Sequence, residues 1–157
     1  MIGILVIVIE STGKMSSDNT SRWLLPLWIK LFGPITPERW AVVHHWIRKT
    51  GHFLGYGCVS LCFFEGWRAT FSGTVRNHRR ILPRAATLAI VSTLVLASWD
   101  EWHQSFLPGR TSAVSDVGID VSGAVVAQLL LLLVLVIVSR VRAARLNAFS
   151  PQVSSQV

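Results

Sequence analysis

Two long apolar runs constrain the fold more than any other feature of this sequence. They cover residues 85–98 and 121–138, and neither contains a charged side chain. A helix needs about 20 mainly apolar residues to cross the hydrocarbon core of a bilayer, a length that both runs approach with their flanking residues. The mean hydropathy of +0.49 and the hydrophobic content of 51% are also high for a soluble domain of 157 residues. The sequence therefore predicts an all-α fold, a polytopic bundle of membrane helices.

Three full transmembrane helices are predicted, and with the connections between them they form a core over residues 49–139. A basic or polar segment precedes each helix, so each apolar stretch has a recognisable start. The second helix is expected to end at Pro108-Gly109, because proline lacks a backbone N–H and glycine favours a helix end. The three expected ranges are about Thr50–Trp67, Ala85–Phe106 and Ser115–Ser139.

The N-terminal apolar stretch, residues 1–9, is too short to cross a bilayer as a helix. It also lacks the basic region that precedes the apolar part of a signal peptide. We interpret it as a truncated first transmembrane segment that begins upstream of this start. An in-frame upstream start codon would support that interpretation.

Residues 10–48 are predicted to form an external loop with interfacial segments. The beginning, up to Ser21, is rich in serine and threonine and is expected to be a loop. Residues 23–32 are apolar and aromatic but interrupted by Pro26, so this segment is expected to lie in the lipid headgroup region. A further helix is expected to begin where an N-cap residue, a first-turn proline and an acid follow each other: Thr36, Pro37 and Glu38.

The basic residues indicate membrane topology, and no nucleic-acid partner is expected. The formal net charge is +7 at pH 7, but the basic residues flank the apolar runs and do not form one polar face. The connection from Arg68 to Arg84 holds five basic residues and no acid, whereas the connection from Asp100 to Asp116 holds one arginine and three acids. Since positive charge favours the cytoplasmic side, the second connection should face outward. This predicts a multi-pass protein of the inner or plasma membrane, with a cytoplasmic basic tail at residues 140–157.

Helix rise places polar residues of the three predicted helices at one depth. Asp100 lies sixteen residues after Arg84, about 24 Å, and Asp120 lies twenty residues before Arg140, about 30 Å. Both positions reach the outer boundary of the hydrocarbon, where the first full helix begins at Lys49 with a polar stripe. The candidate ligand-binding residues of this polar layer are Lys49, His52, Tyr56, Asp100, Glu101, Gln104, Arg110, Ser112, Asp116 and Asp120.

Three functions remain open for the polar layer. The first is a structural network of ion pairs and hydrogen bonds that fixes the helix register. The second, given equal weight, is a pocket for a polar or anionic ligand, with Arg110 and Lys49 as anion contacts. The third, given less weight, is a membrane enzyme in which Asp100 or Glu101 is the general base and His52 or His103 its acid/base partner.

The expected partners are membrane lipids, including an anionic lipid headgroup or a lipid-linked cell-wall precursor at the outer leaflet. No metal and no cofactor are expected, because the histidines, cysteines and acids do not follow the spacing of a dedicated metal site.

These polar residues resemble the VanZ-like family of membrane proteins over about residues 48–127. The resemblance implies a four-helix integral membrane protein associated with low-level resistance to the glycopeptide teicoplanin. Because glycopeptides act on cell-wall precursors outside the cell, an outward-facing layer would lie in the right compartment. The chain departs from the family pattern in its short first segment and in Ala127, where a second glycine is common. The matching residues are Lys49, His52, Tyr56, Asp100-Glu101, Gln104, Pro108-Gly109-Arg110, Ser112, Asp116, Asp120 and Gly123.

Arg110 and Arg79 lead to the first testable prediction. Arg110→Ala is expected to abolish the function of the protein, because the variant lacks the guanidinium group that pairs with carboxylates or an anionic ligand. Arg79→Ala should only perturb membrane insertion, because that arginine acts through topology. The activities are compared at matched amounts of protein in the membrane, and equal losses would contradict the prediction.

Overall fold

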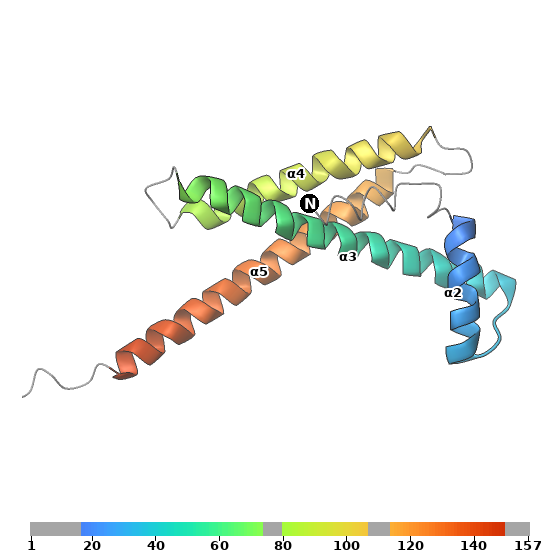
Figure 1. Ribbon diagram of the computed structural model, residues 1–157, viewed down its shortest axis with the longest axis horizontal. Coiled ribbons are helices and arrows are strands. Elements are labelled where there is room, and N and C mark those ends of the chain that lie inside the picture. Colours follow the sequence, from blue (N-terminus) through green and yellow to red (C-terminus); the bar gives the residue numbers. More distant parts are fainter. Residues whose placement is uncertain (1–16, 74–79, 107–113, 150–157) are drawn as a thin grey trace, which may run out of the picture.

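The computed structural model describes residues 17–73, 80–106 and 114–149 of the chain. This part of the chain is all-α, as predicted, and contains four helices. In Figure 1, α3, α4 and α5 form the packed part of the molecule, and α2 lies across the N-terminal end of α3. The helices are α2 (Ser17–Phe32), α3 (Pro37–Ser72), α4 (Ile81–Gln104) and α5 (Val114–Phe149).

Helix α3 begins where the sequence predicts but is longer than expected. The Thr36 side chain accepts a hydrogen bond from the backbone N–H of Arg39, and Pro37 occupies the first turn. The helix then continues without interruption to Ser72. The helix expected to begin at Thr50 is therefore continuous with the helix that begins at Pro37. Gly51 lies at that point, and its cost of about 1 kcal/mol relative to alanine does not interrupt the helix.

Helix α2 corrects two further expectations about the N-terminal region. The expected loop that ends at Ser21 is wrong for residues 17–21, which are helical, and Pro26 does not break the helix. Gly33 ends α2 with a φ of +89°, and its N–H donates to the carbonyl oxygen of Ile29 at 3.0 Å. Only glycine adopts that backbone conformation without strain.

The side of α3 that carries Trp40 and His44 holds α2 in place. The Trp40 indole N–H donates to the Ser21 hydroxyl at 2.7 Å, and the Trp28 and Trp40 rings lie 6.1 Å apart. His44, which the sequence suggests is an ordinary surface or interface histidine, is buried between the helices. Its Nε2 lies 3.1 Å from the Thr20 hydroxyl, and its ring stacks on Trp40.

The His44 contact predicts that α2 docks less tightly at acidic pH. Burial lowers the pKa of His44 below its ordinary value of 6.5, and the charge of Arg48 lowers this pKa further. The undocked state then binds more protons, so the contribution of His44 to docking is fully present above about pH 6.5 and weakens as the pH falls through that value. The distribution of distances between spin labels at positions 27 and 41 should become broader when the pH is lowered from about 7.5 to about 5.5.

His44→Gln is the matched control for this pH dependence, because glutamine can still form a hydrogen bond with Thr20 but does not titrate. Its label distance should not change with pH. A pH response of equal size in the variant would show that another group controls the docking of α2.

Helices α4 and α5 are the two helices of the described part that are long and apolar enough to cross a membrane. Their candidate spans are Ile81–Gln104, with a mean hydropathy of 1.7, and Val114–Leu146, with a mean hydropathy of 2.9. Helix α5 does not stop near Ser139 but continues to Phe149, so the expected end of the third helix is wrong, and the cytoplasmic basic tail stays a prediction. Arginine is a good helix former, and the three arginines there can extend the helix beyond the apolar run.

The third predicted span, Thr50–Trp67, lies inside α3, which is less apolar than α4 and α5 and is not among the candidate spans. The reason lies in its composition, because this stretch contains Gly51, Gly57 and several polar side chains that face the other helices. That α3 crosses the membrane therefore stays a prediction.

The packed interior is built from small residues on α4 and large ones on its neighbours. Ala85, Ala86 and Ala89 are buried against Phe64 of α3, with leucines of α5 at the edge of the cluster. By contrast, the side chains of Leu129, Leu130 and Leu133 are more than half exposed on α5. Exposed leucines in such numbers are costly in water but not in lipid, so this face is suited to hydrocarbon.

Glycine brings α3 and α5 into backbone contact. A Cβ atom at Gly123 would collide with the carbonyl oxygen of Phe53, and a Cβ atom at Gly57 would lie 3.2 Å from the carbonyl oxygen of Gly123. Gly123 therefore lets the backbone of the neighbouring helix approach closely. Small residues are the usual means of close helix packing in membranes.

Candidate functional site

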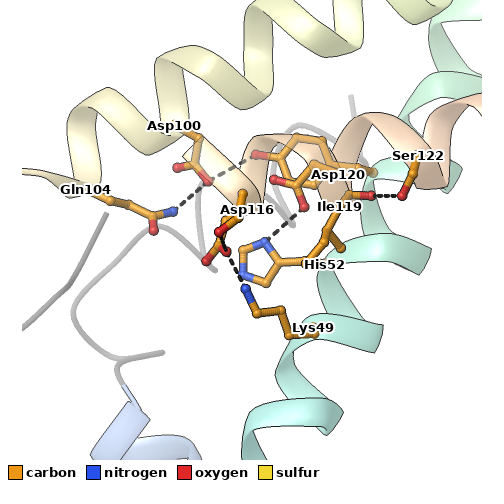
Figure 2. Close-up of polar contacts among 10 residues, drawn as sticks. Lys49, His52, Asp100, Gln104, Asp116, Ile119, Asp120 and Ser122 are labelled. Atoms are coloured by element: carbon orange, nitrogen blue, oxygen red, sulfur yellow. Dashed lines mark hydrogen bonds and ion pairs between the residues drawn. The ribbon is translucent and has the colours of Figure 1, made fainter. Parts of the chain in front are cut away.

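The structure brings seven of the sequence-predicted site residues into one group of polar contacts, which we call the outer layer. Figure 2 shows that its side chains come from α3, α4 and α5, and most of the contacts join two helices. The spacing of three and four residues places the members of each helix on one face. The seven residues are Lys49, His52, Tyr56, Asp100, Gln104, Asp116 and Asp120.

The accessible part of the outer layer is an ion pair between Lys49 and Asp116. The Lys49 ammonium contacts the Asp116 carboxylate, which also accepts a hydrogen bond from the Ser115 hydroxyl. The side chains of Lys49 and Asp116 are 21% and 34% exposed. Both charges can therefore meet a ligand that approaches from this end of the bundle.

Asp100 lies deeper and is almost fully buried. The Tyr56 hydroxyl donates to its Oδ2 at 3.0 Å, and the Gln104 amide donates to the same oxygen at 2.7 Å. All three side chains are buried. A buried carboxylate is stable only with such donors, because transfer out of water is otherwise very costly.

Asp120 is the second buried carboxylate. Its Oδ1 lies 3.3 Å from Nδ1 of His52, and its side chain is 4% exposed. The His52 ring also stacks on Tyr56, with ring centres 6.2 Å apart. Tyr56 contacts Asp100 in turn, so the two buried carboxylates are linked through neighbouring side chains of α3.

Of the remaining candidates, Glu101 and His103 lie within the described residues. Glu101 is half-buried next to Asp100 on α4. Arg110 and Ser112 lie outside the described residues, as does Arg79. His103, a candidate partner for an enzymatic base, is exposed near the end of α4.

One pair of interior polar residues is missing from the sequence-based prediction. The Gln128 side-chain amide donates to both the carbonyl oxygen and the hydroxyl of Ser60 at 2.9 Å, and both residues are buried. The sequence does contain a signal for this pair. Gln128 interrupts an apolar run, and a polar side chain within a membrane helix usually faces the protein interior.

Comparison with known proteins identifies the family. The model of the VanZ/LLP1 family matches residues 2–136, which include every candidate residue of the polar layer. No curated protein and no solved structure matches the chain. The resemblance based on the stretch from Lys49 to Gly123 is confirmed by a match that covers most of the sequence. With two helices apolar enough to span a bilayer, the chain is a membrane protein that belongs to the VanZ/LLP1 family.

Proposed function

We propose that the outer layer faces away from the cytoplasm and binds the polar headgroup of a lipid or of a lipid-linked cell-wall precursor. The observation that carries this proposal is the arrangement of charge by depth. An accessible pair, Lys49 and Asp116, lies above two buried carboxylates, Asp100 and Asp120. In this proposal α3 also crosses the membrane over about residues 50–67, and the bundle lies in the inner or plasma membrane.

The chemistry of the layer is suited to a headgroup that carries both phosphate and hydrogen-bond donors. Lys49 can exchange its contact with Asp116 for a phosphate oxygen, and Arg110 is the second cation proposed for that role. The carboxylates of Asp100 and Asp120 can accept hydrogen bonds from hydroxyl or amino groups of the same ligand.

Aromatic residues support this position relative to the membrane. Trp46, Trp99 and Trp102 are each more than half exposed on the segments of α3 and α4 that flank the layer. Tryptophan is enriched at the boundary between hydrocarbon and headgroups. A headgroup at that depth would be within reach of the outer layer. By binding it, the protein would contribute to teicoplanin resistance or to maintenance of the cell envelope.

A structural network is the second candidate, and one observation favours it. The contacts Lys49–Asp116, His52–Asp120 and Tyr56–Asp100 each join two helices, as register-fixing contacts do. In that case the protein would hold its shape through these residues and bind no particular lipid. An enzymatic role is less favoured than either.

Native mass spectrometry with lipid analysis of the detergent-extracted protein distinguishes the two candidates. A specific lipid should copurify with the unmodified protein and be lost in Lys49→Met and in Arg110→Ala. Glu65→Gln is the matched control, because Glu65 forms an exposed ion pair with Arg68 on the same helix, outside the layer. If folded Lys49→Met, Arg110→Ala and Glu65→Gln retain the same lipids, the binding proposal is wrong and the network remains.

A further inference from the structure

A second polar layer lies deeper in the bundle than the outer layer. It consists of Ser60 on α3, Thr93 on α4 and Gln128 on α5, each no more than 1% exposed. The positions repeat those of the outer layer, because each lies seven or eight residues inward from a member of it on the same helix: from His52, Asp100 and Asp120. Two helical turns correspond to about 11 Å, so all three helices carry a polar residue at a similar depth.

The hydrogen bonds of Gln128 leave one of its atoms unsatisfied. Its Nε2 donates to the carbonyl oxygen of Ser60, and since a carbonyl oxygen can only accept, this bond fixes which end of the amide faces α3. The other end, Oε1, is buried and accepts no hydrogen bond from the described residues. Burial of such an acceptor without a donor is costly, above all where lipid surrounds the protein.

We propose that Gln128 Oε1 binds a water molecule, held also by the hydroxyls of Ser60 and Thr93. The Ser60 hydroxyl accepts from Gln128 Nε2 and keeps its own hydrogen to donate. The Thr93 hydroxyl donates to the carbonyl oxygen of Ala89 at 2.8 Å and keeps lone pairs to accept. A water at this site would donate to Gln128 and Thr93 and accept from Ser60, and about three such bonds are typical of buried water.

This water would enter from the outer layer only. On α3 the polar side chains of His52, Tyr56 and Ser60 follow each other at helical spacing toward the inner layer. The next residue inward on that face, Phe64, is packed against the alanines of α4 in a buried apolar cluster. In this proposal the inner layer is the closed end of a row of polar side chains on α3 that begins at the outer layer.

Solid-state NMR of the full-length protein in lipid bilayers tests the inference, with polarisation transferred from water to glutamine side chains labelled with ¹⁵N. The chain contains Gln104, Gln128, Gln152 and Gln156, and the signal of Gln128 is identified by its loss in Gln128→Met. The Gln128 amide should receive water polarisation at a rate within about threefold of that of Gln104. Alanine methyl groups of the apolar cluster, such as that of Ala89, give the dry reference.

Thr93→Val and Thr93→Ser form a matched pair, because valine has the shape of threonine without its hydroxyl. The transfer to Gln128 should fall several-fold in Thr93→Val and remain in Thr93→Ser. A Gln128 signal that builds up as slowly as Ala89 in the unmodified protein would overturn the inference. So would a transfer that Thr93→Val leaves unchanged. Neither result depends on whether the outer layer binds a lipid.

Discussion

Gly123→Ala is expected to separate α3 from α5 and to lower the free energy of unfolding by about 3 kcal/mol. The added Cβ would collide with the carbonyl oxygen of Phe53 and lie 2.9 Å from its carbonyl carbon. Both are backbone atoms of a continuous helix, so no side-chain rotation relieves the clash and the helices must move apart. Because Asp120 lies within one turn of Gly123, the His52–Asp120 contact should be lost as well.

Gly118→Ala on the same helix is the control for this prediction. No heavy atom lies within 4 Å of the Cβ that it would add, and alanine favours a helix over glycine by about 1 kcal/mol. This variant should be as stable as the unmodified protein or slightly more stable. The free energy of unfolding of both variants is measured in mixed micelles that contain an increasing fraction of a denaturing detergent. Equal stabilities would contradict the close crossing of α3 and α5.

The sequence predicts that the outer-layer residues lie at one level of the bundle, because that level follows from helix rise. Asp100 and Asp120 lie at fixed distances from basic residues at the opposite boundary, and Lys49 lies at the start of an apolar stretch. The pairing within the layer could not be predicted, because it depends on how the helices rotate about their axes. The contacts of Tyr56 with Asp100 and of His52 with Asp120 come from that rotation.

The errors at helix ends share one physical cause. The end of an apolar run marks a predicted membrane boundary, and a helix is not obliged to end there. Helix α3 already begins at Pro37, before Thr50, and α5 continues beyond Ser139 to Phe149. Direct end signals located a terminus well, as Thr36-Pro37 did for α3.

Removal of the Asp100 side-chain acceptor is expected to have the other large effect. Tyr56 and Gln104 both donate to Oδ2 of Asp100, and all three side chains are buried. Asp100→Leu would remove the oxygen to which two buried groups donate, at about 1–3 kcal/mol for each lost bond. The variant should therefore lose about 2–6 kcal/mol of stability in the same unfolding measurement, and a change below about 1 kcal/mol would show that the two donors find other acceptors.

Asp100→Asn separates the role of the charge from the role of the hydrogen bonds. Because both donors reach one oxygen, the single carbonyl oxygen of asparagine can accept both bonds, while the variant loses the negative charge and carries an NH2 group in place of the other oxygen. We therefore expect Asp100→Asn to fold with nearly the stability of the unmodified protein. If the carboxylate serves a ligand, the folded variant will lose the copurifying lipid; if it serves only the network, the lipids will not change.

Glu101→Gln completes the comparison, because Glu101 is the half-buried neighbour of Asp100 on α4. A functional loss confined to Asp100→Asn would assign the binding role to the carboxylate that Tyr56 positions, whereas equal losses would assign it to the charge of the layer as a whole. Normal lipid retention and normal teicoplanin susceptibility in both folded variants would contradict a ligand site on α4. Only a structural role for the outer layer would then account for a carboxylate buried at this depth.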